Sequence, residues 1–181
     1  MTYPPAAPPS QLPAVSPAAC APVYWSTQAT GAYQVTAHLD GIATSRTSDG
    51  IASFALTAYD TTDAPKVMAD LHQALTACAH AHITSPDPLA SGESYANPQV
   101  QPAPHLGDDA LSFHLTHHLD ADDIDPDPLD VPMTFTVVRV GATIVTFWNE
   151  GDATHTTPRT IPPELIPAQI TKLTTTTHQP A

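Results

Sequence analysis

Residues 131–150 (VPMTFTVVRVGATIVTFWNE) limit the possible folds of this chain more than any other segment. Two runs rich in β-branched and aromatic residues, 133–139 and 143–148, stand on either side of Gly141, a pattern that predicts a β-hairpin with a tight turn. The second run is apolar at successive positions, which is typical of a central strand covered on both faces. We therefore expect a sheet with this hairpin at its centre.

Three further strands and two helices are predicted from the spacing of apolar residues. Alternation with a period of two predicts strands over residues 33–39, 51–59 and 111–119. Apolar residues three and four positions apart predict amphipathic helices over residues 63–81 and 163–173.

The order of these elements is β-β-α-β-β-β-α. It predicts an α+β domain, in which an antiparallel sheet carries two helices packed on one face. Residues 83–106 contain five prolines and are expected to form a long loop. The folded domain is expected to span residues 20–174, between a Pro/Ala-rich disordered linker at 1–19 and a frayed tail at 175–181.

The charge of the chain excludes some partners. Eighteen acidic residues against five basic ones give a formal net charge of −13. Such a surface repels phosphate backbones and anionic membranes, so we expect no nucleic acid as a partner. No run of about 18 apolar residues is present, so we expect no transmembrane segment in this chain. The first residues also lack the basic and apolar regions of a leader peptide.

The two cysteines, Cys20 and Cys78, match no zinc-binding spacing. They are either two buried free thiols or one disulfide that ties the end of the N-terminal linker to the first helix. In the loop-entropy model such a bridge contributes about 4 kcal/mol to stability. A bridge would also indicate an oxidising compartment outside the cytoplasm.

Several short motifs follow one another in an order that resembles a known family. They are AACAP at 18–22, LTAC at 75–78, GDDALSF at 107–113, VVRVGATIV at 137–145, and the closing helix at 165–173. The series resembles the small extracytoplasmic sensor or lipoprotein domains of actinobacteria, and is similar to the extracellular domain of PknH-type membrane kinases. The resemblance implies an extracytoplasmic α+β domain with Cys20 and Cys78 bridged. The chain departs from the family in one respect, because we find no lipid-attachment cysteine after a leader peptide and so expect no anchor or leader in this chain. This leaves three alternatives: a secreted protein, a lipid-anchored protein, or the outer part of a larger membrane protein.

Three aromatic residues and one rare cation are the candidates for ligand binding. Trp25, Tyr95 and Trp148 can line a cleft that has the long loop as its lip. The alternative for all three is packing in the core or at its edge. Arg139 can bind an anion, but pairing with a nearby aspartate is the preferred interpretation.

A cluster of histidines and aspartates near residues 117–123 is the candidate metal site. His117 or His118, with Asp120 or Asp122, can hold a divalent ion, whereas the alternative is a set of exposed, solvated side chains. The acidic run that begins at Asp120 lacks the central glycine and the twelfth-position glutamate of an EF-hand, so we expect at most weak divalent binding there.

No motif in the chain predicts a reaction. A nucleophile elbow and a phosphate-binding glycine-rich loop are both missing from the sequence. We therefore predict a non-catalytic binding or sensor module, without a cofactor, for a small molecule, a cell-envelope component or a partner protein. The alternative is a metal-dependent hydrolase built on the cluster near residues 117–123. An apolar cleft between helices and sheet would favour the first hypothesis, and convergent histidines and aspartates in a concave pocket the second.

Overall fold

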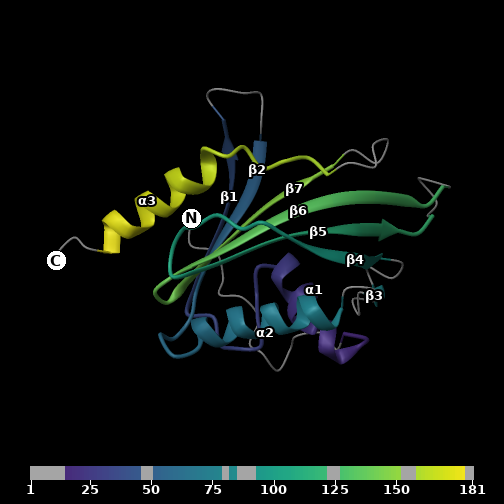
Figure 1. Cartoon of the computed structure of the whole chain (residues 1–181), viewed down its shortest axis with the longest axis horizontal. Coiled ribbons are helices and arrows are strands. Elements are labelled where there is room, and N and C mark those ends of the chain that lie inside the picture. The colour runs from purple at the N-terminus through teal and green to yellow at the C-terminus, as the bar shows by residue number, and fades with distance from the viewer. Residues whose placement is uncertain are drawn as a thin grey trace.

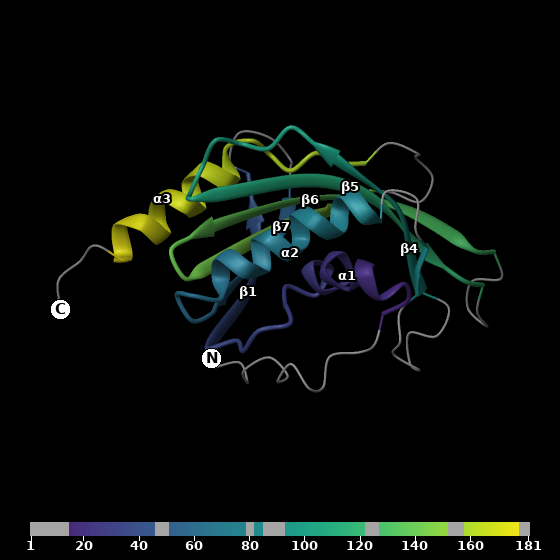
Figure 2. The same cartoon turned by 60° about the horizontal axis from the view of Figure 1, so that its bottom comes forward.

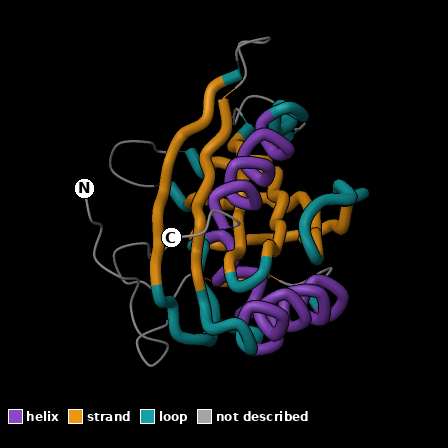
Figure 3. The backbone as a smooth tube through the Cα atoms, turned by 90° about the vertical axis from the view of Figure 1, so that its left-hand side faces the viewer, coloured by secondary structure: helices purple, strands orange, loops and turns teal. Residues whose placement is uncertain are grey.

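A twisted antiparallel sheet of seven strands forms the centre of the molecule (Figures 1 and 3). The computed structural model describes residues 15–45, 51–78, 82–84, 93–121, 127–151 and 158–177. The strands are β1 (Ala37–Thr44), β2 (Ile51–Ala58), β3 (His82–Thr84), β4 (Glu93–Gln101), β5 (Asp109–Leu119), β6 (Leu129–Val140) and β7 (Thr143–Glu150). They lie side by side in the order β1-β2-β7-β6-β5-β4-β3. The chain therefore crosses from β2 to the far edge of the sheet, and then returns strand by strand.

The predicted hairpin is confirmed as β6 and β7 at the middle of this sheet. Gly141 makes the turn with φ +59°, a conformation that suits glycine, while the space around it is open. Val140 pairs with Thr143 across the turn, and β5 and β2 pair with the outer sides of the hairpin. Phe135 and Phe147, one on each strand, are fully buried. The hairpin is thus the centre of the core as well as of the sheet.

Helices cover both faces of the sheet (Figure 1). They are α1 (Ala21–Thr27), which follows a 3-10 helix (Ala18–Cys20), α2 (Ala64–Ala77) and α3 (Leu165–Thr177). On one face, α1 and α2 lie side by side over a cluster that includes Leu71 and Phe135 (Figure 2). On the other, α3 packs through Ile166 and Ile170 on a cluster that includes Phe147.

The α+β class with an antiparallel sheet is confirmed, but the two predicted helices lie on opposite faces rather than on one. The reason is visible along the central strands, because neighbouring residues of β6 face opposite ways. Val137 belongs to the cluster under α1 and α2, whereas Val138 belongs to the cluster under α3. A strand that is apolar at successive positions exposes apolar surface unless both faces are covered.

Three elements were missed by the prediction. Helix α1 has seven residues, too few for a helical period to stand out. Strands β3 and β4 occupy much of the expected loop at 83–106. Pro98 in β4 is fully buried beside Asn97 (φ +53°), where the register with β5 shifts. Such a bulge is a position at which a strand accepts proline.

Some elements begin or end at other residues than the sequence predicts. The first strand lies at Ala37–Thr44 instead of 33–39, because it is an edge strand whose residues are mostly exposed and show no apolar alternation. Val15 is buried in the core, so the folded part includes residues assigned to the linker. Helix α3 ends at Thr177, within the predicted tail. Residues 1–14 and 178–181 lie outside the described part of the chain.

Candidate functional site

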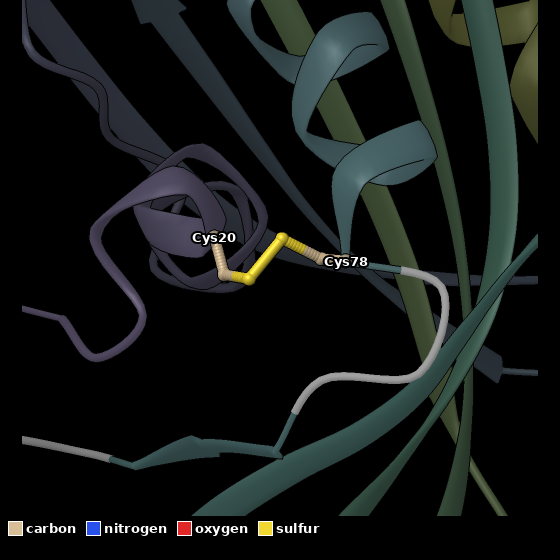
Figure 4. The surroundings of a disulfide bond; sticks show 2 residues. All are labelled: Cys20 and Cys78. Carbon is tan, nitrogen blue, oxygen red and sulfur yellow. A yellow bond between two sulfur atoms is a disulfide. The ribbon is translucent and has the colours of Figure 1, made fainter.

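A disulfide holds α1 and α2 together. Cys20, at the start of α1, is bonded to Cys78, at the end of α2, and both cysteines are buried (Figure 4). The bridge that the resemblance implied is therefore present. Farther along the helices, the Tyr33 hydroxyl donates a hydrogen bond to Asp70 Oδ2 at 3.0 Å, which ties the segment after α1 to the middle of α2. Helix α2 is thus tied at one end to the start of α1 and at its middle to the segment that follows α1.

A narrow crevice lies between these helices and the sheet. Its walls include Trp25, Tyr33, Tyr59, Asp70 and Val137, and its volume is about 20 Å³. That volume is enough for about one water molecule. Trp25 Nε1 is buried and has no hydrogen-bond partner in the protein. Burial raises the pKa of the Tyr59 hydroxyl well above its usual range, so it stays neutral. The crevice is apolar but too small for a ligand, so it does not form the binding cleft that the first hypothesis expects.

An open groove lies on the same face of the sheet, beyond the C-terminal end of α1. Its volume is about 630 Å³, within the range of roughly 300–1,000 Å³ that is usual for small-molecule sites. The end of α1 and strands β1, β2 and β7 form its walls. The lining residues are Thr27, Gln28, Ala29, His38, Asp40, Gly41, Ile42, Ser53 and Trp148.

The turn that follows α1 separates the groove from the crevice. Ala29 lines both hollows and has φ +48°, which reverses the chain directly after the helix. Its carbonyl oxygen accepts a hydrogen bond of 2.8 Å from the hydroxyl of Thr57 on β2. This bond fixes the turn against the sheet, and with it the wall of the groove.

A polar chain of three side chains forms one side of the groove. His38 Nδ1 lies 3.0 Å from Thr57 Oγ1, and His38 Nε2 lies 2.9 Å from Asp40 Oδ1. The order carboxylate, imidazole, hydroxyl is that of a nucleophile relay. Thr57, however, is 2% exposed, and its hydroxyl donates its proton to the Ala29 carbonyl. The hydroxyl proton is thus engaged by a backbone carbonyl, and the His38 imidazole lies between Thr57 and Asp40.

The structure places the four predicted ligand-binding residues at separate sites. Trp25 lines the crevice and Trp148 lines the groove. Tyr95 is buried in the core, where its ring stacks on His117 with 4.6 Å between centroids. Arg139 lies beside the β6–β7 turn. Trp25, Tyr95 and Trp148 therefore do not line one common cleft, although both tryptophans line hollows on one face of the sheet.

The preferred interpretation of Arg139, pairing with an aspartate, is confirmed. Its Nη1 lies 3.1 Å from Asp108 Oδ2, an oxygen that also accepts a 2.7 Å hydrogen bond from the Gly141 backbone. Gly107, with φ +68°, packs so closely on the Arg139 carbonyl that a Cβ would lie 2.3 Å from its oxygen. Two of the motifs behind the resemblance, at 107–113 and 137–145, thus form one structural contact at the hairpin turn.

The candidate metal ligands do not converge. His118 Nδ1 lies 2.7 Å from Asp130 Oδ1, and its Nε2 lies 3.3 Å from Asp120 Oδ1, so its two nitrogens face different carboxylates. The hydrogen bond to Asp130 raises the pKa of His118. His117 stacks on Tyr95 on the other face of the sheet. Asp122 lies outside the described residues, among which no three histidine, cysteine or acidic side chains are placed to share a metal ion.

Sequence reasoning missed the polar residues of the groove, Gln28, His38, Asp40 and Ser53. His38 and Asp40 are two positions apart on β1 and so share a face, which is a signal that the sequence carries. The sequence does not show that this face meets Trp148. That meeting depends on β2 pairing with both β1 and β7.

Comparisons with known proteins assign the chain to no family. No protein-family model, curated protein or solved structure matches it. The resemblance to actinobacterial sensor domains therefore stays a prediction. None of the helices in the described part of the chain is long and apolar enough to cross a membrane.

Proposed function

We propose that this chain is a non-catalytic, extracytoplasmic binding or sensor module, which takes a small molecule or part of a cell-envelope component in its open groove. One observation carries the proposal: a hollow of ligand size joins an indole ring, that of Trp148, to polar side chains at fixed positions. A site of this kind orients a ligand through a few polar contacts and gains affinity from the ring.

The fixed wall of the groove supports binding over catalysis. The hydroxyl nearest to an imidazole, that of Thr57, is buried and donates its proton to a backbone carbonyl. Asp40 is half-exposed and lies beside His38, so it can accept hydrogen bonds from a ligand. These groups recognise a ligand without reacting with it.

The Cys20–Cys78 bridge supports an extracytoplasmic location. Disulfides persist in oxidising compartments and are rare where thiols are kept reduced. The bridge joins the two helices that flank the crevice, next to the groove. A sensor that works outside the cytoplasm gains from such a covalent tie, because it keeps the binding face assembled.

A fragment screen by two-dimensional ¹⁵N NMR on the oxidised protein tests the proposal. Ligands should shift the backbone signals of Gln28, Asp40 and Ser53 together with the indole signal of Trp148. Asp40→Asn should weaken these ligands. Asp120→Asn removes the same charge from another aspartate that faces a histidine, and should leave them unchanged. Shifts confined to other surfaces, or none from a library of several hundred fragments, would contradict a binding role for the groove.

A further inference from the structure

The groove presents two kinds of surface to a ligand. Trp148 contributes a flat aromatic ring, and Gln28, His38, Asp40 and Ser53 contribute polar groups beside it. A ligand that satisfies both must itself be amphipathic, with a flat apolar face and a rim of hydrogen-bonding groups. A pyranose sugar has this form, since one face of its ring carries C–H groups while hydroxyls surround its edge. From this match we infer that the groove binds a saccharide that carries no negative charge, an inference that rests on the proposed function.

Trp148 is placed to act as the platform for a sugar ring. It lies on β7, a central strand, with Ser53 directly across on β2 and Phe135 directly across on β6. The indole packs on the cluster under α1 and α2 and is only partly buried. The ring is therefore held in place by its neighbours, and stacking on it costs little conformational entropy.

The polar groups beside the ring cover the needs of a sugar hydroxyl, which both donates and accepts. The Asp40 carboxylate is an acceptor; its side chain is 51% exposed, and one oxygen lies 2.9 Å from His38 Nε2. The Gln28 amide supplies a donor and an acceptor, and its Nε2 lies 3.3 Å from Thr27 Oγ1. Ser53 adds a hydroxyl in register with Trp148. These contacts come from three elements and so define one orientation of the ligand.

The charge of the groove selects among saccharides. Neither lysine nor arginine is among the groove's lining residues in the described structure, whereas Asp40 is. The whole chain carries a net charge of −13. Uronic acids, sialic acids and sugar phosphates would be repelled. Neutral sugars and amino sugars meet no such barrier.

An organic cation is the competing ligand, because Asp40 and Trp148 both attract positive charge. Sites that select quaternary ammonium groups surround them with several aromatic rings. Among the described residues that line the groove, Trp148 is joined by a single further ring, the His38 imidazole, whose nitrogens already face Thr57 and Asp40; the other lining groups are hydrogen-bonding or aliphatic. The composition therefore favours a polyhydroxylated ligand over a simple cation.

The test is an NMR titration of the oxidised protein with four probes. Maltotriose and cellotriose are the neutral sugars, chitotriosamine is the amino sugar, and trigalacturonate is the acidic sugar. At least one of the first three should shift the Trp148 indole and Ser53 signals at millimolar concentration, and trigalacturonate should not. Asp40→Asn should weaken binding by about tenfold, the loss expected for one charge-assisted hydrogen bond. Asp120→Asn should leave it unchanged.

The outcomes separate this inference from the proposed function. If fragments bind the groove but none of the neutral or amino sugars does, the saccharide is wrong and the binding role stands. If tetramethylammonium shifts the groove and sugars do not, the ligand class is a cation and the inference fails. If neither fragments nor sugars bind, both proposals fail. Binding of trigalacturonate at the groove would overturn the charge argument.

Discussion

The two faces of the sheet are stabilised in different ways. Under α1 and α2, a disulfide, a tyrosine–aspartate hydrogen bond and a large apolar cluster act together. Under α3, a smaller apolar cluster is joined by polar ties: Asn149 donates hydrogen bonds to the Ile51 and Thr160 carbonyls, and Ser45 bonds Glu164 at the start of the helix. No disulfide joins α3 to the sheet, because the chain contains only two cysteines.

The difference does not lie in the presence of a hollow, because a second one, of about 380 Å³, is lined by α3 and by Phe54 and Phe147 on the opposite face. A buried tryptophan N–H without a protein partner costs stability. That N–H, of Trp25, lies on the face that carries the covalent bridge. The bridge offsets this cost by restricting the unfolded chain.

Removal of the disulfide should have the largest effect, and should loosen one face more than the other. In the double variant Cys20→Ala with Cys78→Ala, the free energy of unfolding should fall by about 4 kcal/mol, as the loop-entropy model predicts. Urea denaturation followed by tryptophan fluorescence measures the loss. Hydrogen exchange should rise more in α1 and α2 than in α3. Reduction of the natural chain should reproduce both effects, and a loss below about 1 kcal/mol would mean that the bridge does not stabilise this face.

Asn149→Ala tests the polar tie of the opposite face. Its side-chain amide donates to two backbone carbonyls, at 2.9 and 3.1 Å, so the variant should lose about 1–3 kcal/mol of unfolding free energy. The matched control is Thr134→Val on β6, directly across from Asn149. The Thr134 hydroxyl is buried without a hydrogen-bond partner, so its removal should be neutral or stabilising. Equal losses in the two variants would show that the hydrogen bonds of Asn149 do not hold this face.

The central hairpin and α2 could be predicted from the sequence because their signals are local. A glycine between two β-prone runs, and apolar residues at helical spacing such as Met68, Leu71 and Leu75, need no knowledge of the rest of the chain. The same reasoning failed at β4. There Pro98 indicated a loop, but the backbone accommodates it in a bulge.

The groove could not be predicted because it is assembled from distant segments. His38 is exposed to the groove only because β1 pairs with β2, and Trp148 is near it only because β2 also pairs with β7. These pairings follow from the topology, which the local pattern of apolar residues does not specify. The residues alone also left the cysteine pairing open, since a bridge requires the N-terminal segment to cross α2. Of the three aromatic candidates, Trp25 and Trp148 line hollows, whereas Tyr95 fills the core.

Tyr33→Phe should have a smaller effect, confined to the face with the disulfide. The variant removes the hydrogen bond to Asp70 but keeps the ring, so unfolding free energy should fall by about 1 kcal/mol. Hydrogen exchange at Gly31 and its neighbours should rise, since the segment after α1 loses its tie to α2. Lys66→Ala probes the exposed side of the same tyrosine: the Lys66 ammonium pairs with Asp63 and lies 5.6 Å from the centre of the Tyr33 ring, so its loss should cost at most about 1 kcal/mol. If both variants leave exchange unchanged, the crevice is closed by apolar packing alone.

The smallest expected effect is a difference in pKa between two histidines that lie on the α3 side of the sheet. His114 and His118 are four residues apart on β5, and their pKa values move in opposite directions. The hydrogen bond to Asp130 raises the pKa of His118, whereas burial lowers that of His114. An NMR titration of the ring signals should therefore give a midpoint above about 6.5 for His118 and below it for His114. Asp130→Asn should lower the first midpoint and leave the second unchanged.

The signs of the two stability effects follow from which state binds the proton more tightly. For His118 the folded state binds the proton more tightly. Its contribution to stability is therefore complete below a pH of about 6.5 and is lost as the pH rises through the pKa of the folded state. For His114 the unfolded state binds the proton more tightly, so stability falls as the pH drops from about 6.5 towards the pKa of the folded state. Replacing His114 by Gln should remove the loss on the acid side, and replacing His118 by Gln should remove the loss on the alkaline side. A common midpoint for the two rings would mean that burial and the Asp130 carboxylate do not distinguish them, and this strand face would then titrate as one surface.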